Sequence, residues 1–152
     1  MALLELKDLH TFFRTKKGIV KAVNGVSYSV EAGRTLGVVG ESGSGKSVSA
    51  MSILQLLDGN GYIDSGEILF EGRDLTQLSE KEMYSVRGND ISVIFQEPMT
   101  SLNPVFRIGA QIDEVIALHD GEGKSKEDIK KRTVEMLEMV GIANSQGVYE
   151  MY

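Results

Sequence analysis

The sequence contains no cysteine, only two histidines and no long apolar run. Without cysteine the chain can form no disulfide and offers neither a thiolate nucleophile nor a sulfur ligand for zinc. His10 and His119 lie far apart in the sequence, which also disfavours a zinc site. No segment approaches the roughly 18 apolar residues that a membrane-spanning helix needs, and the N-terminus alternates charged with apolar residues, unlike a signal peptide. We expect any contact with a membrane to be made through a partner.

Excess positive charge is also lacking, because the 152 residues carry a net charge of -6. Affinity for a phosphate backbone needs clustered Lys and Arg, so we expect no nucleic-acid partner. Two short basic clusters, Arg14/Lys16/Lys17 and residues 124–132, are interleaved with polar or acidic residues and are interpreted as solvated faces. The hydrophobic share of 41% and the charged share of 25% are those of a folded globular domain.

Alternating and apolar runs predict several strands. Residues 2–9 and 19–30 alternate and are separated by a Lys-Lys-Gly turn, which predicts an antiparallel pair. Residues 65–70 read as a strand that a Glu-Gly turn closes into a hairpin. Residues 35–39 are apolar on both faces, which predicts a buried parallel strand, and residues 91–95 are expected to form another apolar strand.

Helical periodicity appears in four other places. Residues 48–57 have apolar side chains at a spacing of three, as in a helix packed on a sheet. Ser79 stands three residues before Glu82, the spacing of a capping box, and predicts a short helix. Two amphipathic helices follow, one from residue 108 and one capped by Ser125 that ends near Gly141. No linker separates independent domains.

One motif carries chemistry, and it lies between the predicted strand at 35–39 and the helix after it. Gly40-Glu41-Ser42-Gly43-Ser44-Gly45-Lys46-Ser47 matches G-x-x-x-x-G-K-[ST]. Glycines let successive amides turn toward phosphate oxygens, and the helix dipole adds positive charge there. We expect Lys46 to reach the β- and γ-phosphates and Ser47 to ligate Mg²⁺. A flexible turn before an exposed lysine is the alternative, but a chance match is on the order of one per cent.

A second segment resembles a known family. Residues 91–104, Ile-Ser-Val-Ile-Phe-Gln-Glu-Pro-Met-Thr-Ser-Leu-Asn-Pro, are similar to the Q-loop region of ATP-binding-cassette (ABC) ATPases, and more narrowly of the subunits that drive oligopeptide and dipeptide importers. The phosphate loop and residues 20–26 resemble that subfamily too, so the resemblance covers essentially the whole chain.

The resemblance implies an α/β fold, a P-loop NTPase core of the ABC ATPase type that is truncated. Its expected parts are an antiparallel β-subdomain at 1–34 and 62–78, the P-loop core and Q-loop at 35–61 and 79–103, and the start of a helical subdomain at 104–152.

The resemblance also implies roles for single residues. Gln96 is expected to reach Mg²⁺ and the attacking water, acting with Lys46, while its segment touches the membrane-spanning subunits. Phe13 is expected to stack on adenine, although Phe12 is an alternative and either ring could simply pack the sheet edge. The expected metal ligands are Ser47 and Gln96. The expected nucleotide-binding residues are Phe13, Gly40, Glu41, Ser42, Gly43, Ser44, Gly45, Lys46, Ser47 and Val48.

Several motifs of the family do not occur in the sequence, namely an L-S-G-G-Q signature, a Walker B aspartate, a catalytic glutamate and a switch histidine. His119-Asp120 is rejected as Walker B because the residues before it have helical periodicity. We therefore expect a truncated chain that turns over no ATP by itself. We also expect the strand at 35–39 to keep an unpaired edge that favours self-association.

For the complete protein, the resemblance implies an ATPase peripheral to the cytoplasmic face of a bacterial or archaeal membrane that powers import of peptides or related solutes such as nickel. Its expected partners are permease subunits, a second ATPase subunit and, indirectly, an extracytoplasmic solute-binding protein. A soluble ABC ATPase of translation or DNA repair is the alternative. A P-loop kinase or GTPase would lack the first sheet and the Q-loop, and an inert fragment would bind no nucleotide.

Overall fold

The computed structural model describes residues 2–96, 101–120 and 123–152. The chain divides into two compact units, Met1–Ile91 and Ser92–Tyr152, and each is described by itself. The subdomain boundaries expected at 34/35, 61/62, 78/79 and 103/104 stay a prediction.

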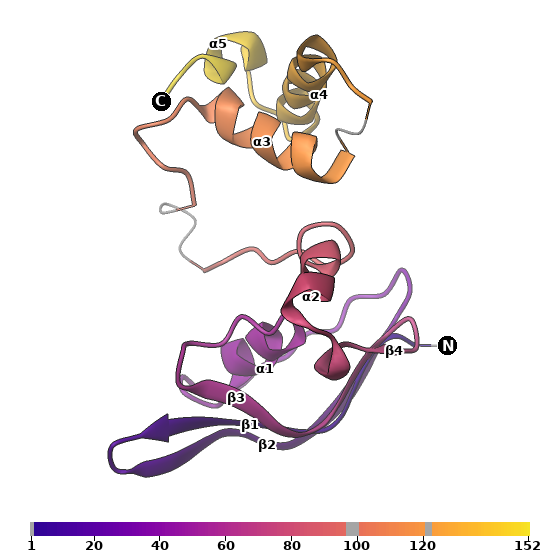
Figure 1. Ribbon diagram of the computed structural model, residues 1–152, viewed down its shortest axis with the longest axis vertical. Coiled ribbons are helices and arrows are strands. Elements are labelled where there is room, and N and C mark those ends of the chain that lie inside the picture. Colours follow the sequence, from indigo (N-terminus) through magenta and orange to yellow (C-terminus); the bar gives the residue numbers. More distant parts are fainter. Residues whose placement is uncertain (1, 97–100, 121–122) are drawn as a thin grey trace. The chain divides into compact units, whose positions relative to one another are not determined.

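The first unit is built on an antiparallel sheet (Figure 1). Its strands, in the order β2-β1-β3-β4, are β1 (Ala2–Thr15), β2 (Gly18–Glu31), β3 (Gly61–Phe70) and β4 (Arg73–Asp74). The predicted pairing of the first two strands and the hairpin after β3 are confirmed. The first strand runs further than predicted, because its second half continues to pair with both neighbours after a bulge near Asp8.

Helix α1 (Lys46–Ile53), the short turn η1 (Leu75–Gln77) and helix α2 (Glu80–Val86) complete this unit. A buried hydrogen bond of 2.8 Å between the hydroxyls of Thr11 and Ser52 ties α1 to the central strand. The apolar core is formed by Leu6, Leu9, Val23, Ile53, Leu54, Ile68, Leu75, Met83 and Val86. Full burial of one such side chain contributes about 1.5 to 3 kcal/mol, so this core holds α1 and α2 to the strands.

Capping boxes start two helices as predicted. The Ser79 hydroxyl accepts from the Glu82 amide while the Glu82 carboxylate accepts from the Ser79 amide. Hydrogen bonds that the carboxylate accepts from the Ser79 hydroxyl and from the Ser79 amide hold the pKa of Glu82 below its usual value. Ser125 and Asp128 make the same pair of bonds at the start of α4. Helix α1 begins two residues earlier than predicted and ends at Ile53, where the chain leaves the helix.

The second unit contains α3 (Ile108–Asp120), α4 (Lys126–Met139) and α5 (Ser145–Tyr149). Asp113 of α3 accepts hydrogen bonds of 2.5 Å from Thr133 of α4 and from Tyr149 of α5, so one carboxylate joins all three helices. The hydrogen bond from the Tyr149 hydroxyl to Asp113 raises the pKa of Tyr149 to about 12. Within the described ranges, no helix has the length and apolar character to cross a membrane.

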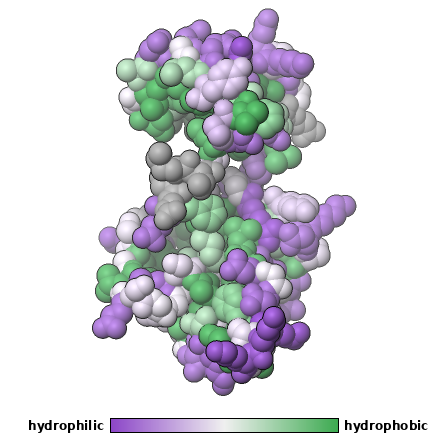
Figure 2. Space-filling view, turned by 90° about the vertical axis from the view of Figure 1, so that its left-hand side faces the viewer, coloured by the Kyte–Doolittle hydropathy of each residue, from purple (hydrophilic) through white to green (hydrophobic). Residues whose placement is uncertain are grey.

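Two predicted strands are wrong. Residues 35–39 and 91–95 are not strands, and Val39 is 93% and Ile94 92% exposed. A parallel strand exists only where a neighbour supplies hydrogen bonds along its edge. Among the described residues the sheet is antiparallel throughout and does not extend to either segment, apart from an isolated bridge between Arg87 and Ile91. Large apolar side chains are consequently exposed, among them Leu36, Val38, Val39, Ile94 and Phe95. Figure 2 shows apolar surface in green on one face of the molecule.

A steric test of the sheet is offered by Gly66, whose φ is +97°. A Cβ there would lie 2.4 Å from the Asp8 carbonyl oxygen and 2.7 Å from the Leu9 Cα. Gly72 has a similar φ of +83° but open space around it, so it is a matched control. We expect Gly72→Ala to cost about 1 kcal/mol of unfolding free energy for its backbone conformation, and Gly66→Ala about 1 to 3 kcal/mol more for the overlap. Urea denaturation followed by circular dichroism measures both, and equal costs would contradict the close approach of β1 and β3.

Candidate functional site

The glycine-rich loop between residues 40 and 45 is shaped by backbone conformations that other residues rarely adopt. Gly43 and Gly45 have φ values of +80° and +89°. At Gly45 a Cβ would also lie 2.4 Å from the carbonyl oxygen of Ala22 on β2. Gly45 is therefore required both by its dihedral angle and by the close approach of the loop to the sheet. This contact fixes the point at which α1 begins.

Lys46 closes over the loop. Its ammonium donates hydrogen bonds of 2.7 Å to the carbonyl oxygens of Gly40 and Glu41, and lies 3.3 Å from the Ser44 hydroxyl oxygen. The only flexible cation of the motif is thus held beside the loop amides and does not extend into solvent. A full positive charge is in place where the motif predicts the phosphates.

The first turn of α1 is open to an anion. Its N-cap residue is Gly45, which makes no side-chain capping bond, and the first turn contains no acidic residue. The first amides of a helix have no partner within it, and the helix dipole places partial positive charge at this end. Ser47, the predicted Mg²⁺ ligand, is exposed in this turn, while Val48 is half-buried. Loop, ammonium and helix terminus together form an anion-binding arrangement.

A hollow of about 430 Å³ lies against the loop. Strand β2 forms one side of it through residues that sequence reasoning did not assign to the site. The lining residues are Ala22, Val23, Asn24, Val26, Tyr28, Val38, Val39, Gly40, Ser44, Gly45, Lys46 and Ser49. No local pattern marks the contribution of β2, because it depends on the long-range approach of the loop to that strand. Glu41, Ser42, Gly43 and Ser47 belong to the motif but do not line the hollow.

The two candidate aromatic residues lie on opposite faces of the sheet. Thr11 bonds to α1, and alternation along β1 places Phe13 on this face and Phe12 on the other. Phe12 is only 7% exposed and packs edge to face with His10 and Tyr62, at ring distances of 5.9 and 6.3 Å. Neither ring lines the hollow. The geometry favours Phe13 over Phe12 as the adenine-stacking residue, and its role stays a prediction.

Gln96 is exposed and belongs to the second unit. Its predicted roles toward Mg²⁺ and water therefore stay predictions. Part of the predicted permease-contacting segment, residues 97–100, lies outside the described residues. His119 and Asp120 lie in helix α3, which confirms that they do not end a Walker B strand.

The geometry defines a P-loop protein, and comparison with known proteins places it in a family. The sequence profile of the ABC transporter family matches residues 23–150, and the chain belongs to this family. It is 56% identical to the oligopeptide transport ATP-binding protein OppD of Bacillus subtilis, over 92% of this chain and 39% of that protein. It is 45% identical to the dipeptide transport ATP-binding protein DppD of Haemophilus influenzae, over the whole chain and 46% of that protein. The chain thus spans less than half the length of these relatives.

Solved structures agree on the fold. The dimeric structure of a bacterial ABC transporter cassette, MJ0796, has a TM-score of 0.82 and 22% identity, covering 97% of this chain and 60% of its own. A nucleotide-free ATP-binding cassette from an ABC transporter gives a TM-score of 0.65 at 23% identity, over 99% of this chain and 57% of its own. The predicted fold class, the ABC ATPase type, is confirmed.

The site predicts where an anion binds. On titration with pyrophosphate, followed by nuclear magnetic resonance, we expect the largest amide shifts at residues 43–48, because the uncapped helix turn and Lys46 meet there. Asp128 and Glu82 already cap α4 and α2, so the amides at those helix starts serve as internal controls. Shifts concentrated at the capped helices, with the loop unmoved, would contradict the assignment.

Proposed function

We propose that this chain binds the phosphates of ATP at the loop of residues 40–47 and is part of the ATP-binding subunit of a peptide importer. The observation that carries the proposal is the Lys46 ammonium, held by two loop carbonyls beside the uncapped start of α1. Phosphate groups carry the opposite charge and accept hydrogen bonds from both the amides and the ammonium. Membership of the ABC transporter family supports ATP as the phosphate compound.

Mg²⁺ fits the residues present. A hard cation of this kind takes oxygen ligands, and the Ser47 hydroxyl is exposed in the first turn of α1. Mg²⁺ would supply charge neutralisation for the terminal phosphates. We propose Ser47 and Gln96 as its protein ligands, with Gln96 also orienting water. Phe13 is proposed to stack on the adenine ring.

The relatives support the transport assignment, because the Bacillus subtilis and Haemophilus influenzae proteins are an oligopeptide and a dipeptide transport ATP-binding protein. We infer that the complete protein works at the cytoplasmic face of the membrane, pairs with a second ATPase subunit and drives permease subunits through its Q-loop region. A solute-binding protein would deliver the peptide from outside. Since signature and Walker B residues are not part of this sequence, we infer that the chain alone binds ATP without turning it over.

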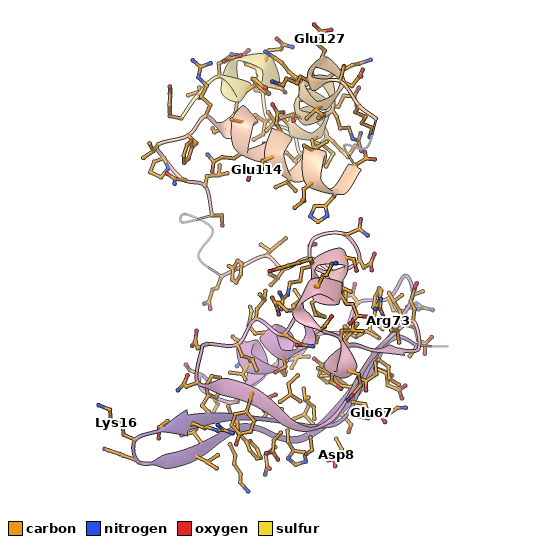
Figure 3. All side chains as sticks on the ribbon, in the orientation of Figure 1. Asp8, Lys16, Glu67, Arg73, Glu114 and Glu127 are labelled. Atoms are coloured by element: carbon orange, nitrogen blue, oxygen red, sulfur yellow. The ribbon has the colours of Figure 1, made fainter. Side chains whose placement is uncertain are left out.

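Substituting the lysine tests the proposal. We expect Lys46→Ala to weaken binding of a fluorescent ATP analogue with Mg²⁺ about tenfold to a hundredfold, since hydrogen bonds to a charged group contribute about 1.5 to 3 kcal/mol. Lys16→Ala, at the tip of the β1–β2 hairpin (Figure 3), is the matched control and should bind as the unaltered chain does. Equal affinity of both variants and the unaltered chain would exclude Lys46 from the site. No binding by the unaltered chain would contradict the proposed function itself.

A further inference from the structure

The C-terminal end of α1 is held by an arginine from a distant part of the sequence. Arg87 is the C-cap residue of α2, and its Nε donates a hydrogen bond of 2.8 Å to the carbonyl oxygen of Leu54. A second donor of the same guanidinium lies 3.3 Å from the carbonyl oxygen of Gln55. The last carbonyls of a helix have no partner within it, and a cation at this end also opposes the negative end of the dipole. Arg87 therefore caps the helix that begins at the phosphate loop.

The other edge of the guanidinium binds Glu80, the first residue of α2. One nitrogen of Arg87 lies 2.5 Å from a Glu80 carboxylate oxygen and another lies 3.4 Å from the second oxygen. The Arg87 side chain is only 18% exposed, whereas that of Glu80 is 63% exposed, so this ion pair is open to water on its carboxylate side. A planar fork is needed to reach two carbonyls on one edge and a carboxylate on the other, and a lysine ammonium lacks that shape.

The residue that Arg87 holds is conformationally strained. Gln55 has a φ of +52°, which residues other than glycine rarely adopt. Its side chain donates to the carbonyl oxygen of Leu75 at 2.6 Å, so η1 holds it as well. Such conformations persist only where the surroundings enforce them. Local backbone bonds close α1, from the Gln55 amide to the Ser52 carbonyl at 3.1 Å and from the Leu56 amide to the Met51 carbonyl at 2.9 Å. Arg87 and η1 then hold the two residues that follow the helix, Leu54 and Gln55.

Arg87 also starts the turn that leads along the chain to Gln96. Within this turn the amide of Gly88 donates to the Ile91 carbonyl at 2.9 Å, and the amide of Ile91 donates to the Val86 carbonyl at 3.0 Å. One residue therefore ends the phosphate-loop helix and begins the turn at residues 87–91. A helix of eight residues is too short to be stable alone, so its position depends on contacts such as this.

We propose that Arg87 is a positioning residue for nucleotide binding, which fixes α1 behind the phosphate loop and couples occupancy of the loop to the turn at residues 87–91. The inference rests on the proposed function, because it assumes that the loop binds ATP. Arg87 touches neither the loop nor the hollow beside it, and acts through α1.

Arg87→Lys is the direct test, since it keeps the charge and loses the fork. We expect the dissociation constant for the Mg²⁺-ATP analogue to rise about threefold to tenfold. Hydrogen exchange separates positioning from stability, because a purely structural role for Arg87 would leave the effect of ATP on exchange at the Ile91 amide unchanged. In the unaltered chain, ATP should slow exchange at the Ile91 amide, and in Arg87→Lys this ATP-dependent slowing should disappear. Arg73→Lys is the matched control, because Arg73 (labelled in Figure 3) pairs with Glu82 of α2 at 3.4 Å. Arg73→Lys should change neither the dissociation constant nor the ATP-dependent slowing at Ile91.

Each outcome decides the inference. If the unaltered chain binds no ATP, the proposed function fails. If it binds ATP and Arg87→Lys keeps both the affinity and the slowing at Ile91, Arg87 does not position the site. Lower stability with the ATP-dependent slowing retained would make Arg87 purely structural and would also overturn the proposal. Should Arg87→Lys fail to fold, Glu80→Gln replaces it, because it loosens the guanidinium from one side. Unchanged slowing in Glu80→Gln would then refute the coupling.

Discussion

Helix α1 is attached to the rest of its unit at its start, in its last turn and just after its end, and the candidate site depends on these attachments. At the start, Gly45 approaches the Ala22 carbonyl so closely that no side chain fits. In its last turn, the Ser52 hydroxyl bonds to Thr11 of β1. At the end, Arg87 donates to the carbonyl of the C-cap residue Leu54. Because the phosphate loop runs directly into this helix, these contacts fix the direction in which its first amides point.

The charges around the loop follow from the same placement. The first turn of α1 has neither a capping side chain nor an acidic residue, so its amides and partial positive charge stay available. Lys46 folds back on the carbonyls of Gly40 and Glu41, which places its ammonium against the phosphate loop. An anion entering here meets helix amides that are already oriented, so little backbone ordering is required on binding.

Local patterns in the sequence predicted much of the fold. The alternation of the first two strands, the capping box at Ser79 and the helix cap at Ser125 are properties of neighbouring residues, and they are confirmed. The strands predicted at 35–39 and 91–95 are wrong because strand formation needs a partner, which a run of apolar residues does not specify. Helix α5 was not predicted, since five residues carry too little periodicity.

The site shows the same division between local and long-range information. The G-x-x-x-x-G-K-[ST] pattern predicted the loop, because its glycines, lysine and helix start are adjacent in sequence. Strand β2 meets the loop where Gly45 approaches Ala22, and Arg87 bonds to Leu54, so both contacts join residues more than twenty positions apart. No spacing in the sequence predicts either contact. Long-range packing therefore determines how the motif is held, while the motif itself determines what is bound.

Calorimetric titration with ATP and with adenosine tests the central claim most directly, because the two ligands share the base and differ in the phosphates. If the loop of residues 40–47 carries the affinity, ATP should bind about a hundredfold or more tightly than adenosine, corresponding to about 2.7 kcal/mol. The difference should shrink in Lys46→Ala. Equal affinities for ATP and adenosine would contradict the account, since binding would then owe nothing to the phosphate loop.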